Sequence, residues 1–291
     1  MFRSLIAVVV IVSLTALTAN AGPVGWWKLD GDGSDSGSSG TDGVANGVIT
    51  YVDVSGDVAG LGSAADLTDG GNADGQNYFD LGAADGALNP GAGAITVAAW
   101  GKLTGNPGGE WGGVASMFGF GDCCGSAAQR SALELALDNN PSRAIFAVDT
   151  RGSGAGESEA IQNFDNVQGN WHHLVGVKRA DGSGTVYING GTTGVKDFDD
   201  ADLGAFSVGT HAASANTQNR VNIGRNPFGA IPKGDRSFNG LIGDVQVYHE
   251  ALTEAQALQL FNNPGTAIPE PSTFLLSLLA MSAAFGFRRI R

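Results

Sequence analysis

Paired carboxylates are the first chemistry to look for here, because the 291 residues include 29 Asp and Glu against 16 Lys and Arg. A glycosidase needs one carboxyl group as general acid and a second as base or nucleophile across the same bond. The closest groupings are Glu134 with Asp138 and Glu157 with Glu159. A pair could also be assembled from separate strands, with Glu134 meeting Glu157 or Glu159 across a sheet. The sequence leaves that arrangement open.

The Gly- and Asp-rich segment 30–35 invites comparison with a calcium-binding EF-hand loop. Such a loop requires Gly at its sixth position and a bidentate Glu at its twelfth. This sequence has Asp35 and Thr41 at those positions, so the pattern fails. We therefore expect a solvated Gly/Ser/Asp loop.

Two pairs of adjacent residues carry side chains that often bind metals. His172 and His173 face opposite sides of a strand and cannot chelate one ion together, so we interpret them as hydrogen-bonded strand residues. Cys123 and Cys124 are the two cysteines of the chain. A vicinal disulfide and a free or intermolecular pair both stay open for them. No C-x-x-C pair is present, which argues against a redox enzyme.

Four aromatic residues lie in or near Gly-rich segments, where they could stack on a sugar ring: Tyr78, Trp111, Phe118 and Phe120. Packing in the core is the favoured interpretation, because aromatic side chains dominate the buried area of protein cores. No ligand can be named from them.

Short strands must position these residues. Gly occupies 46 positions and charged residues make up 15% of the chain, a composition that long helices do not have. Apolar runs such as 95–100, 144–148 and 185–189 stand between clusters of Gly, Asn, Asp and Pro. This spacing is typical of an antiparallel sandwich.

The clearest hairpin joins the segments 171–179 and 185–189 through Asp181-Gly182, which suits a tight turn. A second turn follows at Asn189-Gly190-Gly191. A helix is predicted over 253–261, with Thr253 as N-cap and Gln256 as its capping-box partner. We expect its apolar face to comprise Leu252, Ala255, Leu258 and Phe261.

The N-terminal segment 1–21 predicts a secretory signal peptide. Arg3 precedes the apolar run 5–17, and Ala19-Asn20-Ala21 forms a cleavage site before Gly22. The apolar run is too short for a comfortable membrane span. We therefore expect an exported protein that begins at Gly22.

The C-terminal end of the sequence predicts a segment that is held temporarily in the membrane. Pro269-Glu270-Pro271 precedes an apolar segment, predicted as a hydrophobic helix over 274–287, and a terminal Arg cluster. These residues resemble the PEP-CTERM sorting signal. The resemblance implies handling by an exosortase-type sorting enzyme and release of the body to the cell surface or an extracellular matrix. A plain C-terminal anchor is the alternative, and it would also hold the body at a membrane's outer face.

The segment between these ends resembles a laminin G-like domain of the concanavalin A-like type. The resemblance rests on an ordered series of strand-like strings at 26–30, 78–81, 95–100, 171–175, 186–190, 221–225 and 238–248. It implies an all-β, concanavalin A-like jelly-roll sandwich of two antiparallel sheets with a short C-terminal helix. The expected domains are a signal peptide at 1–21, the sandwich at 22–265 and the sorting tail at 266–291.

The resemblance also bears on chemistry. Related glucanases carry E-x-D-x-x-E on one strand, and no Glu in this sequence begins that pattern, so we predict no enzyme activity. Related sandwiches hold a structural calcium between an early loop and an Asp on the last strand, which nominates Asp30 and Asp244 as ligands. The concave face of the fold binds sugars in some relatives.

Charge narrows the choice of partners. Without its two ends the chain keeps 12 basic and 28 acidic residues, a net charge of −16, and would repel a phosphate backbone. We expect no nucleic acid, and predict instead a non-catalytic surface or matrix protein that binds extracellular polysaccharide or a surface protein. The alternatives are a glucanase-like hydrolase and a structural matrix component without a specific ligand.

Overall fold

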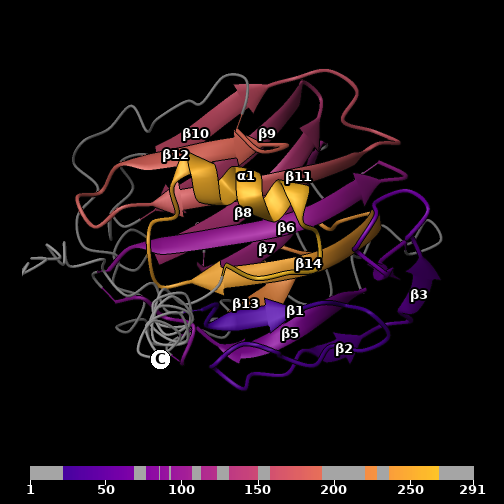
Figure 1. Cartoon of the computed structure of the whole chain (residues 1–291), viewed down its shortest axis with the longest axis horizontal. Helices are drawn as coiled ribbons and strands as arrows, with labels where there is room; N and C mark the ends of the chain where they lie inside the picture. Colours follow the sequence, from indigo (N-terminus) through magenta and orange to yellow (C-terminus); the bar gives the residue numbers. More distant parts are fainter. Residues whose placement is uncertain are drawn as a thin grey trace, which may run out of the picture. The chain divides into compact units, whose positions relative to one another are not determined.

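The structure, a computed structural model, describes residues 22–68, 77–84, 86–91, 93–106, 113–122, 131–149, 158–191, 220–227 and 236–268. Residues 22–268 form one compact unit. The described residues form two antiparallel sheets and one helix (Figure 1), which confirms the predicted fold class.

In the part of the chain that the structure describes, each sheet has seven strands. Sheet A has the order β12 (Gly184–Ile188), β11 (Trp171–Lys178), β6 (Ile95–Leu103), β14 (Gly240–Tyr248), β4 (Ser63–Asp66) and β3 (Thr50–Asp53), with β1 (Gly25–Trp27) also paired to β14. Sheet B has the order β10 (Ser158–Asn163), β9 (Ser142–Asp149), β8 (Ser131–Asn139), β7 (Val114–Asp122), β13 (Arg220–Ile223), β5 (Tyr78–Ala83) and β2 (Val44–Asn46).

The core lies between the two sheets and follows from side-chain alternation along the strands. In β8, Leu133, Leu135 and Leu137 belong to the main buried cluster, whereas Glu134 and Asp138 alternate with them and take the outer face of sheet B. Burying each leucine contributes about 1.5–3 kcal/mol. The inner residues thus hold the sheets together and leave the outer faces free to carry polar groups.

The predicted hairpin is confirmed, since Leu174 of β11 pairs with Ile188 of β12 and Gly182 has a φ of 89° in the turn between the strands. The second turn is confirmed as well, with positive φ at Asn189, Gly190 and Gly191.

Helix α1 (Glu254–Asn262) has the predicted capping box between Thr253 and Gln256. Its apolar face agrees with the prediction in part, because Leu252 is buried and Phe261 packs against the cluster of Val54 and Trp100. The helix buries Ala257 and Leu260, however, whereas Ala255 and Leu258 are exposed. Leu252 precedes the N-cap, so a face counted from it does not follow the helical phase. In Figure 1, α1 lies across the outer face of sheet A, over β6 and β11. No helix among the described residues is both long enough and apolar enough to span a bilayer.

Candidate functional site

A polar row crosses the outer face of sheet B. Backbone register places Glu134 of β8 opposite Gly119 of β7, Gly119 opposite Asn222 of β13, and Asn222 opposite Asp80 of β5. Residues opposite one another in adjacent antiparallel strands share a face. Three polar residues from strands far apart in the sequence therefore line up, with a glycine between the first two.

Glu134 is the most unusual member of the row. Its side chain is 2% exposed, and its Oε2 forms an ion pair with the guanidinium of Arg236. Its Oε1 is buried without a hydrogen-bond partner among the described residues. A buried polar atom without a partner costs about 1–3 kcal/mol. The carboxylate is thus held by one cation and keeps one oxygen able to accept a hydrogen bond.

Ser116 lies close to the same ion pair. Its backbone N–H donates to the carbonyl oxygen of Arg236 at 2.8 Å, so Arg236 contacts both Ser116 and Glu134. The Ser116 side chain is fully buried, and its Oγ also lacks a partner among the described residues. A hydroxyl can donate and accept. The two unpartnered groups together offer one carboxylate acceptor and one donor.

Gly119 makes room for the segment 225–227 to lie over the row. A Cβ at this position would come within 2.6 Å of Pro227 Cδ and 2.8 Å of the Arg225 carbonyl oxygen. The Arg225 guanidinium lies 3.7 Å from the centroid of the Tyr78 ring. In the Asn222 amide orientation that satisfies both of its polar atoms, Arg225 Nε donates to the amide oxygen at 3.3 Å. Burial lowers the pKa of Arg225.

The other carboxylates on this face are satisfied by arginines. Arg220 donates to both oxygens of Asp80, at 2.8 Å from Nε and 2.6 Å from Nη2. Arg143 Nε donates to Asp138 Oδ2 at 2.7 Å, and the backbone of Asn140 donates to Oδ1. Each of these four oxygens has a donor, so Glu134 stands apart from its neighbours on the described part of this face.

One of the carboxylate pairs that the sequence left open, Glu134 with Glu159, occupies a single row of paired positions across sheet B. Glu159 of β10 is the partner of Ala147, and Ala147 is the partner of Glu134. The Cα positions of residues 159 and 134 are thus two strand spacings apart, about 10 Å. Glu157, Cys123, Cys124, Trp111 and the motif Pro269-Glu270-Pro271 lie outside the described residues.

Asp244 is buried on β14 and is surrounded by N–H donors. Its Oδ1 accepts from Trp26 Nε1 at 2.7 Å and from Gln246 Nε2 at 2.8 Å, and its Oδ2 accepts from the Gly265 backbone at 2.8 Å. Burial raises the pKa of Asp244. N–H groups that point at both oxygens occupy the positions that a directly bound cation would need. This donor set does not fit calcium coordinated by Asp244.

Asp30, the other predicted calcium ligand, is exposed in the turn after β1 and lies beside Gly62, whose added Cβ would be 3.1 Å from Asp30 Oδ2. Within the described ranges, no three or more His, Cys, Asp or Glu side chains gather as a metal site would require. The calcium site predicted for Asp30 and Asp244 is not tested by these contacts, although the N–H donors around Asp244 argue against direct coordination by that residue.

The predicted solvated loop is organised by Asp35. Its carboxylate accepts hydrogen bonds from the backbone of Trp26 at 2.8 Å, Gly37 at 2.7 Å and Thr41 at 2.9 Å, and from the Ser39 hydroxyl. Intramolecular donors thus hold this acidic loop.

His172 and His173 face opposite sides of β11, as predicted. His172 bonds the Asn166 carbonyl oxygen at 3.1 Å and contacts Phe164, whereas His173 packs against Trp100, with ring centroids 5.0 Å apart. Burial lowers the pKa of His173 to about 3. Neither residue is placed as a metal ligand.

Of the aromatic residues considered from the sequence, Phe118 and Phe120 pack in the main core, in line with the favoured interpretation. Tyr78 contacts Arg225 instead. The sequence did not point to Ser116, Asn222 or Arg236. Alternation along β8 was the one local signal available, since it separates Glu134 from the buried leucines.

Solved structures of similar fold include the binding domain of Paraclostridial Mosquitocidal Protein 1, at 14% identity and a TM-score of 0.54 over 83% of this chain and 52% of that one. The receptor-binding domain of the botulinum neurotoxin C/D mosaic serotype matches at 9% identity and a TM-score of 0.52, over 83% and 51%. The binding domain of botulinum neurotoxin DC in complex with rat synaptotagmin II matches at 13% identity and a TM-score of 0.51, over 79% and 48%.

This chain thus spans about half the length of the solved chains it resembles, and at such identities the likeness shows the fold. No curated protein sequence matches the chain. The family model Laminin_G_3, described as the concanavalin A-like lectin/glucanases superfamily, matches residues 70–257. With that match over more than half of its length, and with the two-sheet fold, the chain belongs to the concanavalin A-like lectin/glucanases superfamily.

Proposed function

We propose that this protein is an exported, non-catalytic binding module that recognises an extracellular polysaccharide or a surface protein through the outer face of sheet B. The observation that carries the proposal is two buried polar atoms without a hydrogen-bond partner among the described residues, Glu134 Oε1 and Ser116 Oγ, whose residues both contact Arg236. Binding sites use a few placed polar groups to orient a ligand. The binding domains of similar fold described above support a binding function.

A hydroxyl-rich ligand suits this pair of atoms better than a charged one. Glu134 already has a cation in Arg236, so a further cation is not needed to balance its charge. A sugar hydroxyl can donate to Glu134 Oε1 and accept from Ser116 Oγ at the same time. A saccharide is therefore the preferred ligand, and a protein with exposed hydroxyl side chains is the alternative.

Export rests on the two ends of the sequence. The signal peptide predicted over 1–21 and the tail with Pro269-Glu270-Pro271 support delivery to the cell surface or matrix, with transient membrane anchoring through the tail and processing by an exosortase-type enzyme. Mass spectrometry of surface-extracted protein tests this: a mature chain that starts at Gly22 and lacks residues 274–291 is the expected result. A retained tail would leave export in place and remove the processing step.

A glycan array probed with the exported protein, with and without calcium, tests the binding function. Glu134→Gln keeps the size of the side chain but removes the charge, and Ser116→Ala removes the hydroxyl. Glu134→Gln should bind at least about tenfold more weakly, the equivalent of one weakened charged hydrogen bond, and Ser116→Ala about threefold to tenfold more weakly, the equivalent of one lost neutral hydrogen bond. Glu254→Gln on helix α1 is the matched control. Absence of saturable binding would favour a structural matrix component without a specific ligand.

A glucanase-like hydrolase is the second candidate, and the register of residue 159 with Glu134 is the observation in its favour. The Cα separation of about 10 Å is slightly above the roughly 6.5–9.5 Å that lies between the carboxyl groups of inverting glycosidases. Against it, Glu134 is tied to Arg236. Release of reducing sugar from laminarin, lichenan, agarose or carrageenan, abolished by Glu134→Gln, would make the protein an enzyme.

A further inference from the structure

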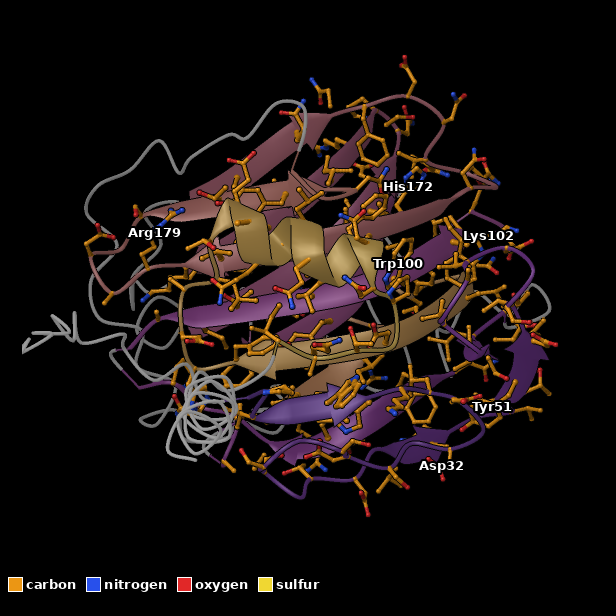
Figure 2. All side chains as sticks on the ribbon, viewed as in Figure 1. Asp32, Tyr51, Trp100, Lys102, His172 and Arg179 are labelled. Atoms are coloured by element: carbon orange, nitrogen blue, oxygen red, sulfur yellow. The ribbon has the colours of Figure 1, made fainter. Side chains whose placement is uncertain are left out.

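A second row of side chains crosses the outer face of sheet A, on the sheet opposite to Glu134. Register places Trp171 of β11 opposite Lys102 of β6, Lys102 opposite Leu241 of β14, and Leu241 opposite Asp66 of β4. All four side chains are partly exposed. Figure 2 shows Lys102 beyond the end of helix α1 that lies at Trp100, so the helix leaves this part of the sheet uncovered.

Asp57, from the turn between β3 and β4, fixes the aromatic member of this row. Trp171 Nε1 donates to Asp57 Oδ2 at 3.1 Å, and Lys102 Nζ donates to the same oxygen at 3.1 Å. The Asp57 side chain is 51% exposed. Both bonds end on Oδ2, which leaves Oδ1 to accept from a ligand. The neighbouring ammonium lowers the pKa of Asp57 and keeps it ionised at neutral pH.

The indole is also held by apolar packing. Trp171 and Leu241 pack against the buried cluster that contains Val54, Val58 and Trp100. Packing on one side and a hydrogen bond at Nε1 restrict the ring to one orientation, so little side-chain entropy is left to lose on binding. A partly exposed aromatic ring held in this way is suited to stack on a flat apolar surface.

We propose that Trp171, Lys102 and Asp57 form a binding site for a neutral pyranose ring. A pyranose presents C–H groups on its face and hydroxyls around its rim. The indole stacks on the C–H face of the sugar ring, Asp57 Oδ1 accepts from one hydroxyl, and Lys102 donates to another. Asp57 and Asp66 disfavour an acidic sugar here, because like charges repel.

A protein partner fits the same surface less well. Stable protein interfaces need an apolar centre of several buried side chains, whereas this row offers one indole and Leu241. The proposed site lies on the sheet opposite to Glu134 and does not depend on the function proposed for sheet B. If both sites bind sugar, one molecule contacts two saccharide chains on opposite faces.

Isothermal titration of the exported protein with cellohexaose, laminarihexaose, xylohexaose and chitohexaose, followed also by tryptophan fluorescence, tests the site. We expect Trp171→Ala to weaken binding of at least one of them by about tenfold or more. Trp171→Phe should recover part of the affinity, and Asp57→Ala should weaken it several-fold. A melting curve for each variant confirms that it is folded.

Glu134→Gln is the control that separates this site from sheet B. A ligand that is lost in Trp171→Ala and kept in Glu134→Gln supports the site on sheet A, whatever happens on sheet B. Wild-type affinity in Trp171→Ala, binding of none of the four oligosaccharides, or preferential binding of alginate at Trp171 would each overturn the proposal.

Discussion

The backbone N–H of Gly265 donates to Asp244 Oδ2 at 2.8 Å and ties the chain that follows helix α1 to strand β14. The next alternate residues of β14 continue this attachment. Gln246 Nε2 donates to the Thr266 carbonyl oxygen at 2.9 Å, and the Ile268 N–H donates to the Tyr248 hydroxyl at 3.2 Å. Hydrogen bonds to the sandwich therefore continue to Ile268, directly before the predicted sorting motif.

Asp244→Ala should lower the free energy of unfolding by about 3 kcal/mol, because it leaves three N–H donors without their charged acceptor. For a protein of this size that loss corresponds to a fall in melting temperature of roughly 6–12 °C. Differential scanning calorimetry measures it. Asp66→Ala is the matched control on β4, where Asp66 is partly exposed, and should change the melting temperature little. Equal effects of the two substitutions would contradict the role given to Asp244.

The same scans test the calcium prediction for Asp30 and Asp244. A ligand that binds the folded state alone stabilises it by about 2.7 kcal/mol at a hundred times its dissociation constant. Because Asp244 already accepts three N–H groups, we expect wild-type protein to melt at the same temperature with calcium and with chelator. A lower melting temperature in chelator that disappears in Asp244→Ala would establish the site.

Asp35→Ala should destabilise the sandwich by about 2 kcal/mol, since its carboxylate holds the loop that follows β1 through donors from four residues. Asp32 is a suitable comparison because it lies in the same loop and accepts from the Ser34 backbone at 2.9 Å. Asp32→Ala should cost less than about 0.5 kcal/mol. Urea unfolding of the two variants at pH 7 gives both values, and a reversed order would show that Asp35 does not organise the loop.

Much of the fold follows from local sequence rules. The Asp181-Gly182 turn and the Thr253–Gln256 capping box each depend on residues within a few positions, and both are present. The polar row of sheet B cannot be predicted from local sequence. Glu134 and Asn222 come into one row only because β7 pairs with both β8 and β13. An irregularity between Ser116 and Phe118 also shifts the register, and alternation alone does not predict it.

His173 should make the protein sensitive to acid. Burial lowers the pKa of its imidazole from the ordinary value of 6.5 to about 3, so the unfolded chain binds a proton at a pH where the folded chain does not. Stability should therefore fall as pH decreases from 6.5 towards 3, with a contribution of about 1.4 kcal/mol per pH unit from this residue.

His173→Phe keeps an aromatic ring against Trp100 and Phe261 and removes the titration. The free energy of unfolding of this variant should depend less on pH over the same interval than that of the wild type. His249→Phe serves as the control histidine. Parallel pH profiles of wild type and His173→Phe would exclude the buried imidazole as the cause.

Gly119→Ala should distort the polar row of sheet B although it substitutes none of the polar residues in that row. The added Cβ would lie 2.6 Å from Pro227 Cδ and 2.8 Å from the Arg225 carbonyl oxygen, so the segment 225–227 must move. Overpacking of this kind costs about 1–3 kcal/mol.

Gly243→Ala is the matched control on a strand of sheet A, because its Cβ would lie 3.4 Å from Leu61, an ordinary contact. We expect a lower melting temperature and weaker glycan binding in Gly119→Ala alone. If Gly119→Ala binds glycans like the wild type, the segment 225–227 has no part in the binding site proposed on sheet B.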